Sequence, residues 1–403
     1  MNEWITISLG EICDKGGGEI RTGPFGSQLH EADYSSDGIP VVMPKDIPSG
    51  KVDEATIARI PVDLVHRLSQ HVLKEGDIVY GRRGDIGRKA LITAREAGWL
   101  CGTGCLRITP GVGIVDPRFL FYRLGAPETV SAIANQAVGA TMPNLNSSIL
   151  RGVSVTLPSL ATQGRIASIL EAYDDLIEVN RQRVVLLENM ARSLFEEWFV
   201  RFRFPGHEAG KIVDTPDGPR PEAWKHVRLD DVLVLQRGFD LPTSARSPGP
   251  FFVISASGRH GAHAEAKVKG PGVVTGRSGT IGKVHLVLED HWPLNTTLYV
   301  KEFKRGGPAF ASLLLRHLDL ATSSSGAAVP TLNRNHVHGL PIAVPPNDFV
   351  DRFEDVAMSW LRLAHNLRSQ IERLAVSRDL LLPRLISGQL LVAAAEREQQ
   401  EAA

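Results

Sequence analysis

Two long amphipathic patterns, far apart in the chain, constrain its fold more than any other sequence feature. In the first, apolar residues recur at alternating steps of four and three, which is the spacing of a coiled-coil seam. No proline or glycine falls between Arg165 and Phe204, so one helix can continue through this stretch. About 38 residues at ~1.5 Å per residue predict a rod of about 57 Å. The seam residues are Ile166, Leu170, Tyr173, Ile177, Val184, Leu187, Ala191, Leu194 and Trp198, with Asn180 as the polar interruption.

The second pattern repeats the first at an offset of 187 residues, so that Phe353 takes the place of Ile166. It predicts a second helix from Asp348 to Leu382. Pro383 lacks an amide proton and should end or kink that helix. The repeated seam consists of Phe353, Ala357, Trp360, Ala364, Leu367, Ile371, Leu374, Leu381 and Leu385, with Arg378 as the charged interruption.

The segments before the two helices are also repeated. Gly81–Gly87 reads Gly-Arg-Arg-Gly-Asp-Ile-Gly, and Gly276–Gly282 reads Gly-Arg-Ser-Gly-Thr-Ile-Gly. An internal duplication therefore explains the paired helices better than two unrelated helices in one core. The residues that recur at the helix offset are Gly139, Ala140, Pro143, Leu145, Asn146, Gly152 and Pro158.

This duplication predicts an α+β protein with two globular domains and two long helices. Short strands are expected in the first domain at Pro40–Pro44, Asp77–Tyr80, Lys89–Thr93, Gly104–Thr109 and Val153–Leu157. The predicted segments are a first domain at 1–158, a helix at 159–203, a Pro/Gly-rich linker at 204–223, a shorter second domain at 224–345, a second helix at 346–390 and a frayed tail at 391–403.

The two seams need partners, and each can bury the other. Because each helix follows its own globular domain, and the domains must sit apart, the helices are expected to run antiparallel. The early seam residues Ile166, Leu170, Tyr173 and Ile177 should then face the later seam near Leu367, Ile371 and Leu374. Asn180 is expected to fix the register of the pair; a solvent-facing Asn at the seam is the alternative.

Composition narrows the class of protein. The three cysteines do not form a disulfide framework, no zinc-ligand spacing is present, and no signal peptide or membrane span is found, so a cytoplasmic location is expected. Net charge is zero, which alone argues against nucleic acid. However, 33 of the 45 basic residues are Arg, whose planar guanidinium suits guanine edges and phosphates.

The two glycine-rich turns are the strongest candidates for contact with DNA, because glycines let main-chain amides approach an anion. Plain hairpin turns would need the same glycines, so both interpretations stay open. The secondary candidates lie in and beside the two Leu-Asn turns, Leu145-Asn146 and Leu332-Asn333, and helix entry and packing is their stronger interpretation. They are Asn144, Asn146, Asn333, Arg334 and Asn335. The candidate DNA-contact residues are Arg82, Arg83, Arg88, Lys89, Arg277, Ser278, Lys283, Arg259, Asn144, Asn146, Asn333, Arg334 and Asn335.

Sequence motifs for catalysis are missing. The chain has no nucleotide P-loop, no methyltransferase motif, no binding loop for S-adenosylmethionine and no nucleophile elbow. The pair His260 and His263 lacks an accompanying Glu pair, so a metal site is not expected. The sequence therefore indicates a non-catalytic protein.

The order of two diverged domains and two equal helices resembles the specificity subunits of type I restriction–modification systems. The residues that carry the resemblance are Thr22-Gly-Pro-Phe-Gly-Ser27, Gly76-Asp-Ile-Val-Tyr-Gly-Arg82, Met142-Pro-Asn-Leu-Asn146, the helix from Gln163 through Trp198-Phe199, and Leu381-Leu-Pro-Arg-Leu-Ile-Ser-Gly388. The resemblance covers nearly the whole chain.

The resemblance implies that each globular domain is a target-recognition domain for one half of a split, asymmetric DNA site. The helices would act as a spacer and dock two methyltransferase subunits, and restriction subunits would join to cleave unmodified DNA. S-adenosylmethionine and ATP with Mg²⁺ would belong to those partners. A helix rod of about 57 Å corresponds to roughly 17 base pairs at ~3.4 Å each. A two-headed adaptor that binds proteins rather than DNA is the alternative.

Overall fold

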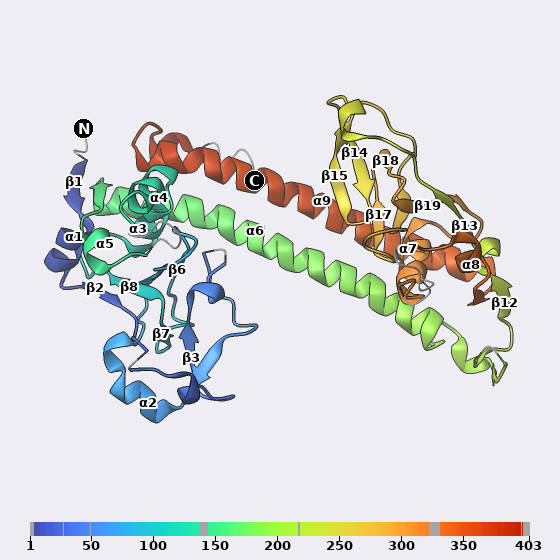
Figure 1. Ribbon diagram of the computed structural model, residues 1–403, viewed down its shortest axis with the longest axis horizontal. Helices are drawn as coiled ribbons and strands as arrows, with labels where there is room; N and C mark the ends of the chain where they lie inside the picture. Colours follow the sequence, from blue (N-terminus) through green and yellow to red (C-terminus); the bar gives the residue numbers. More distant parts are fainter. Residues whose placement is uncertain are drawn as a thin grey trace. The chain divides into compact units, whose positions relative to one another are not determined.

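The computed structural model describes residues 4–26, 28–48, 50–137, 144–216, 218–321, 331–395 and 397 (Figure 1). The chain forms two compact units, and each contains one β-rich domain together with part of both long helices. The first unit comprises Met1–Leu176 and Arg373–Ala403, and the second comprises Ile177–Glu372. Ser27 of the Thr-Gly-Pro-Phe-Gly-Ser motif, and Gly139, Ala140, Met142 and Pro143 before the first Leu-Asn turn, lie outside the described residues.

The first domain is built on a four-stranded antiparallel sheet in the order β2-β8-β5-β6. Its strands are β2 (Glu19–Thr22), β8 (Cys105–Thr109), β5 (Ile78–Gly81) and β6 (Lys89–Leu91). A smaller sheet has the order β4-β3-β7, formed by β4 (Ala58–Ile60), β3 (Ile39–Val42) and β7 (Leu100–Cys101). The strand pair β1 (Ile5–Ser8) and β9 (Ser154–Leu157) leads into the first long helix.

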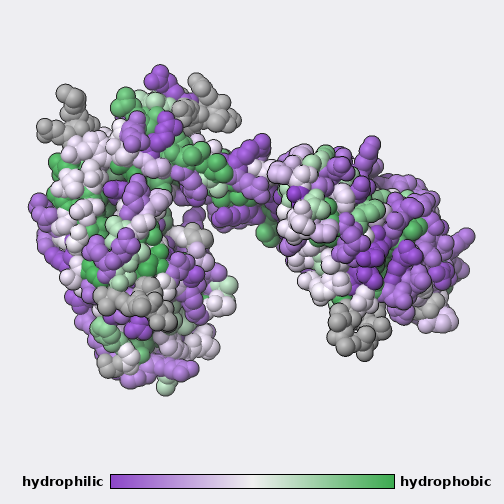
Figure 2. All heavy atoms as spheres, turned by 45° about the horizontal axis from the view of Figure 1, so that its top comes forward, coloured by the Kyte–Doolittle hydropathy of each residue, from purple (hydrophilic) through white to green (hydrophobic). Residues whose placement is uncertain are grey.

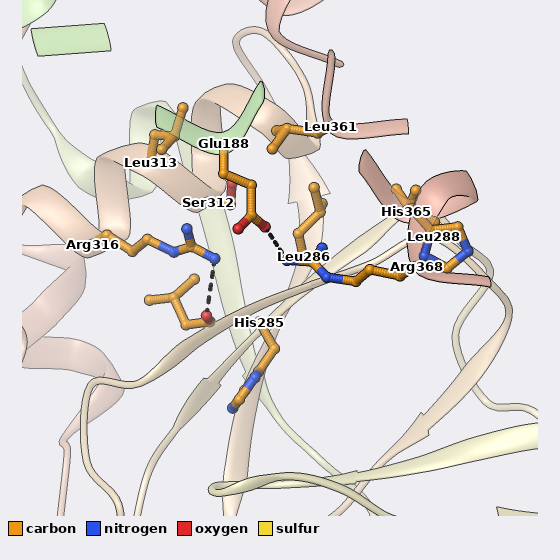
Figure 3. Close-up of a pocket in the computed structure, with 11 residues that line it drawn as sticks. Glu188, His285, Leu286, Leu288, Ser312, Leu313, Arg316, Leu361, His365 and Arg368 are labelled. Carbon is orange, nitrogen blue, oxygen red and sulfur yellow. Dashed lines mark hydrogen bonds and ion pairs between the residues drawn. The ribbon is translucent and has the colours of Figure 1, made fainter. Parts of the chain in front are cut away.

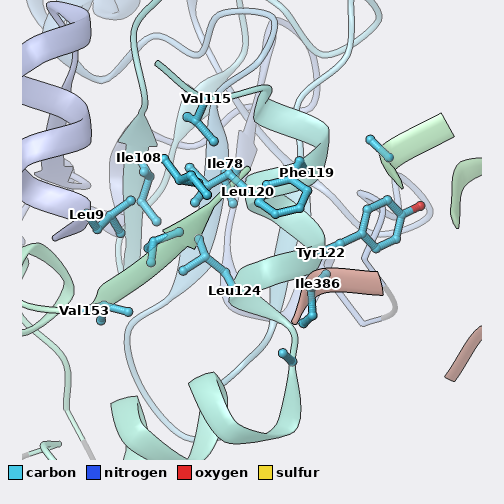
Figure 4. Packing of buried hydrophobic residues seen from close by; sticks show 14 of the residues in the cluster. Leu9, Ile78, Ile108, Val115, Phe119, Leu120, Tyr122, Leu124, Val153 and Ile386 are labelled. Carbon is cyan, nitrogen blue, oxygen red and sulfur yellow. The ribbon is translucent and has the colours of Figure 1, made fainter. Parts of the chain in front are cut away.

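Short helices surround these sheets. They are α1 (Leu9–Gly16), α2 (Val62–Arg67), α3 (Pro117–Leu124), α4 (Pro127–Ala134) and α5 (Ser147–Arg151). Helix α1 begins with a capping box, in which the Ser8 hydroxyl accepts from the Glu11 amide and the Glu11 carboxylate accepts from the Ser8 amide. The main core lies between α1, the larger sheet and α3, and it continues onto the long helices through residues such as Ile386 (Figure 4).

The second domain repeats this arrangement strand for strand. Its four-stranded sheet has the order β13-β19-β16-β17, formed by β13 (Leu233–Arg237), β19 (Thr297–Phe303), β16 (Gly272–Gly276) and β17 (Val284–Val287). The smaller sheet is β15-β14-β18, formed by β15 (Gly258–His263), β14 (Phe251–Ser255) and β18 (His291–Pro293). Strand β12 (Lys225–Arg228) pairs with β20 (Pro341–Val344), and the helices are α7 (Pro308–His317) and α8 (Arg334–His338). The duplication expected from the sequence is thus present in the tertiary structure.

The segment 204–223, expected to be a linker, contains the two-stranded hairpin β10 (Ile212–Val213) and β11 (Arg220–Pro221). Its beginning is anchored, because the ring of Phe204 lies 5.5 Å from that of Trp224 and 5.3 Å from that of Phe349. Of the tail 391–403, which was expected to fray, residues 396 and 398–403 lie outside the described residues, and Val392 and Ala395 are buried in the core of the first unit.

The two long helices are α6 (Leu160–Phe195), followed by a π-helical turn at Glu196–Val200, and α9 (Asn347–Ile386). Pro383 was expected to end or kink the second helix, and it does not end it, since α9 continues through this proline for three more residues. The lost amide costs one hydrogen bond near the end of the helix, while Leu385 and Ile386 beyond it are buried.

In each unit α6 and α9 pack side by side in opposite directions, as expected (Figure 1). The expected register is wrong, however. Ile166 and Leu170 share a core with Leu381 and Leu385, rather than facing residues near Leu367. In the second unit, the residues that cluster around Leu367 are Val184, Leu187, Ala364 and Ile371.

Asn180 on the seam is 2% exposed, which excludes the solvent-facing alternative. Its amide nitrogen has no hydrogen-bond partner among the described residues. The other seam residues of α6 and α9 are buried or half-buried, including Tyr173, Ile177, Leu194, Trp360 and Leu374.

Candidate nucleic-acid interface

The first glycine-rich turn connects β5 to β6 in the antiparallel hairpin of the larger sheet. Gly84 and Gly87 have φ angles of 79° and 111°, and Gly279 and Gly282 of the second turn have 82° and 73°. This left-handed region strongly favours glycine. The glycines are therefore required by the turn itself, whatever the turn binds.

Each glycine-rich turn meets the Leu-Asn turn of its own unit. The amide of Leu145 donates to the carbonyl oxygen of Arg82 at 2.9 Å, and the amide of Leu332 donates to the carbonyl oxygen of Arg277, also at 2.9 Å. Neighbouring residues form isolated β-bridges, Arg83 with Asn144 and Ser278 with Thr331. Two motifs that are about 60 residues apart in sequence thus form one site in each unit.

Two of the Asn candidates are helix caps. The side-chain oxygen of Asn146 accepts from the Ile149 amide at 2.8 Å at the start of α5, and that of Asn333 accepts from the Asn335 amide at 2.9 Å at the start of α8. These contacts agree with helix entry, the stronger interpretation from the sequence. Asn144 differs, because its side-chain oxygen is buried and has no partner among the described residues.

The arginines of the first turn occupy three different environments. Arg82 is half-buried: its Nε donates to the Leu145 carbonyl at 2.7 Å, and its guanidinium lies 5.5 Å from the centre of the Phe25 ring. Partial burial, followed by repulsion from Arg83, lowers the pKa of Arg82. Arg83 is exposed, and Arg88 pairs with Asp85 at 3.0 Å.

Lys89 does not join these arginines. Adjacent residues of a strand point to opposite faces, and the ammonium of Lys89 lies over the Phe121 ring of α3 at 4.6 Å from its centre. Burial lowers the pKa of Lys89 to about 8, and the nearby Asp174 carboxylate opposes this shift. Asp174 belongs to α6, so Lys89 lies between the domain and the long helices.

The second unit has a hollow of about 480 Å³ beside its glycine-rich turn. Three arginines from separate elements line it: Arg237 at the end of β13, Arg277 in the turn and Arg334 at the start of α8. Asn333 and Asn335 line it as well. This concentration of positive charge and amide groups suits phosphate oxygens and base edges.

The remaining candidates of the second unit make local contacts. Lys283 donates to the Ser257 carbonyl at 3.1 Å. The guanidinium of Arg259 lies 3.7 Å from the centre of the Phe252 ring and 3.7 Å from the Glu289 carboxylate. None of these residues lines the 480 Å³ hollow.

Comparisons with known proteins agree with this architecture. A family model described as "Type I restriction modification DNA specificity domain" matches residues 1–189. The MjaIX specificity subunit of Methanocaldococcus jannaschii is 26% identical over 97% of this chain and 94% of its own length. The HindI specificity subunit of Haemophilus influenzae is 33% identical over 33% of this chain and 30% of its own length.

The chain is similar to the specificity subunits of type I restriction–modification systems, through the family model over residues 1–189 and through the MjaIX subunit over nearly its whole length. A solved specificity subunit from M. genitalium has the same fold, with a TM-score of 0.66 at 16% identity over 95% of this chain and 96% of the other.

These similarities agree with the DNA specificity subunit expected from the sequence. Within the described residues, no group of three or more His, Cys, Asp or Glu side chains could hold a metal ion. None of the described helices is long and apolar enough to cross a membrane.

Arg237 was not among the residues expected from the sequence to contact DNA. The amides of Gly23 and Gly238 donate to the carbonyls of Cys105 and Thr297, which hold equivalent places in β8 and β19. Arg237 is therefore the counterpart of Thr22 in the first motif. Aligning the glycines of the two repeats could have revealed this position.

Proposed function

We propose that each β-rich domain of this specificity subunit reads one half of a split, asymmetric DNA site. The observation that supports this proposal is that a glycine-rich turn contacts a Leu-Asn turn in both units through the same main-chain hydrogen bond. The two units thus present different side chains on the same backbone framework. The first frame offers Arg82 beside Phe25, whereas the second offers Arg237, Arg277 and Arg334 around a hollow. Different side chains on one frame should recognise different bases.

We assign direct readout to the arginines and a supporting role to the caps. Arg277 and Arg237 approach the hollow from separate elements, so each can contact a separate base or phosphate. The cap residues Asn146 and Asn333 hold the helices that follow the Leu-Asn turns. Lys89 is assigned to packing between the first domain and α6, not to DNA.

The long helices are assigned two roles, spacing and docking. Helix α6 has 36 residues, which corresponds to about 54 Å, so its length would set the spacer between the half-sites. Several large apolar residues remain exposed on these helices, and apolar patches are visible on the molecular surface (Figure 2). These residues are Leu176, Val179, Val185, Leu186 and Met190 on α6, and Val356, Leu363, Val376 and Leu380 on α9.

Large apolar residues exposed along both helices support contact with a partner protein. Two methyltransferase subunits are the proposed partners, with restriction subunits joining the assembled complex. S-adenosylmethionine and ATP with Mg²⁺ would be used by those subunits.

The decisive experiment exchanges residues 1–158 for the corresponding domain of another specificity subunit. The chimaera is assembled with the methyltransferase subunits, and the methylated sites are mapped by sequencing. One half-site should change while the other half-site and the spacer stay the same. A change in both halves would refute the assignment of one half-site to each domain. A gel shift on duplex DNA, with and without methyltransferase subunits, separates a DNA reader from a two-headed protein adaptor.

A further inference from the structure

A second hollow, of about 220 Å³, lies in the second unit where α7 and β17 meet the two long helices. Three of its charged residues come from three helices: Arg316 from α7, Glu188 from α6 and Arg368 from α9. The two guanidinium groups extend toward the hollow from opposite sides, and the Glu188 carboxylate lies between them (Figure 3). This hollow is separate from the 480 Å³ hollow beside the glycine-rich turn, which is lined by Arg237, Arg277 and Arg334.

Positive charge exceeds negative charge in this hollow. Arg368 pairs with Glu188 at 2.5 Å, while Arg316 donates to the Val284 carbonyl at 3.3 Å and has no carboxylate within 4.0 Å among the described residues. Partial removal of water lowers the pKa of Arg316; Glu188 opposes this effect, and Arg192 and Arg368 add to it.

The two histidines that line the hollow do not change this balance. His365 pairs with Glu289 at 3.0 Å, so any charge on its ring is matched by that carboxylate. His285 lies 3.2 Å from the Ala256 carbonyl through Nε2, and burial lowers its pKa, which favours the neutral ring at pH 7.

The first unit shows what the corresponding place looks like when it is filled. Lys89 and Val284 are equivalent, because they pair with Tyr80 and Thr275 in the two hairpins. Gly125 is equivalent to Arg316, since α3 and α7 both begin at a proline, Pro117 and Pro308. A β-carbon at Gly125 would lie 2.3 Å from the Lys89 ammonium, which therefore takes the space of a side chain there.

The positive side chain at this place is thus Lys89 of strand β6 in the first unit and Arg316 of helix α7 in the second. In the first unit, Arg378 pairs with both Asp174 and Asp379, and the Asp174 carboxylate also acts on the nearby Lys89 ammonium. The Tyr122 hydroxyl also donates to Asp174 at 2.7 Å and closes the network. The second unit has two arginines and one carboxylate at this place, together with an open hollow.

We propose that this hollow binds a phosphate group between Arg316 and Arg368. Guanidinium groups bind phosphate oxygens through paired, charge-assisted hydrogen bonds. Two guanidinium groups can bind one phosphate from opposite sides. The volume corresponds to roughly seven waters at ~30 Å³ each, which is enough for a phosphate and a few waters. The phosphate is either a free anion, such as inorganic phosphate or a phosphate monoester, or a phosphate of the DNA backbone.

The first experiment titrates inorganic phosphate into the full-length chain by calorimetry, with NaCl adjusted to keep the ionic strength constant. The wild-type chain should bind one phosphate. Arg316→Met and Arg368→Met should each weaken this binding at least tenfold, and Arg316→Lys should restore part of it. Arg362→Met removes the same charge from an exposed site on α9 outside the hollow, so it should leave phosphate affinity unchanged.

Glu188→Gln is predicted to increase phosphate affinity, a result that loss of folding cannot produce. It removes the carboxylate that competes for Arg368, so phosphate should bind several-fold more tightly. Circular dichroism of each variant checks that it is folded.

The second experiment separates the two sources of phosphate by measuring how duplex-DNA affinity depends on salt. If the DNA backbone is the source, free phosphate does not bind, and Arg316→Met and Arg368→Met each reduce the salt slope by about one while Arg362→Met does not. If neither the phosphate affinity nor the salt slope responds to Arg316→Met and Arg368→Met, the proposal is overturned.

Discussion

The carbonyl oxygen of Arg82 accepts a hydrogen bond from the amide of Leu145 at 2.9 Å, which holds the first glycine-rich turn against the first Leu-Asn turn. The same contact at the same distance joins Arg277 and Leu332 in the second unit. It is made by main-chain atoms, so the side chains of the turn can change without breaking it. This contact would let the two proposed DNA readers share one framework and differ in specificity.

Arg277→Ala tests direct readout in the second unit. Loss of an arginine–guanine pair should weaken binding of the cognate site by about 1–3 kcal/mol and relax one base position in one half-site. The measurement is affinity for a panel of duplexes with single-base changes. Arg82→Ala should have the corresponding effect on the other half-site. If both variants keep wild-type affinity, base preference and salt slope, the turns are purely structural.

Arg83→Ala provides the contrasting case. This residue is exposed, and a phosphate contact would weaken binding by the same factor on every sequence and reduce the salt slope by about one. A change confined to one base position would instead assign Arg83 to base readout.

Asn146→Ala tests the cap of α5. Without the side-chain oxygen, the Ile149 amide loses its partner, and the free energy of unfolding should fall by about 0.5–2 kcal/mol. Chemical denaturation measures this change, and Asn146→Asp, which keeps an acceptor, is the matched control. The base preference of the complex should not change. Altered base preference with unchanged stability would mean that Asn146 contacts DNA.

Lys89 predicts a pH dependence of stability. Its pKa falls from an ordinary value of 10.5 to about 8 on folding, so the folded chain binds the proton less tightly than the unfolded chain does. Between pH 8 and 10.5 Lys89 carries more protons in the unfolded state than in the folded state. The contribution of Lys89 to the free energy of unfolding should therefore rise with pH in this range. Below pH 8 the cost of burying the charge is present in full.

The measurement compares the denaturation midpoints of wild type and Lys89→Met at pH 7.5 and pH 10. Lys89→Met should gain stability relative to wild type at pH 7.5 and lose part of that advantage at pH 10. Lys283→Met, which removes an exposed lysine, is the control and should show no such difference. An advantage for Lys89→Met that is independent of pH would show that its proton is not linked to folding.

The spacer role of the helices predicts the effect of lengthening them. Four residues inserted after Gln182 in α6 and after Glu372 in α9 add about 6 Å to the pair. The methylated site should gain one or two base pairs of spacer at ~3.4 Å each, with both half-site sequences unchanged. Mapping of methylated sites gives the readout. An insertion of equal length at Gly210, in the segment between α6 and the second domain, is the control and should leave the spacer unchanged. If the complex with the helix insertions is active and keeps the original spacer, the helices do not set the spacer length.

The sequence by itself determined the repeats and the elements within them. The period of 3.5 residues specified both long helices, because periodicity is a local property of the chain. The hairpin around Gly81–Gly87 was equally readable, since its glycines and short flanking strands lie close together in sequence. The expected strands Asp77–Tyr80 and Gly104–Thr109 correspond to β5 and β8, because a strand pattern is also a local property of the sequence.

Only the tertiary structure decided how these elements meet. A heptad seam is nearly the same after a shift of one heptad, so it cannot reveal that Leu170 packs with Leu385 rather than with residues near Leu367. Proximity in sequence placed Lys89 with the turn arginines, whereas strand alternation turned it toward Phe121. Arg237 reached the second site through pairing of β13 with β19. In each case the outcome depends on contacts between distant segments, which packing and hydrogen bonding fix only once the whole domain has folded.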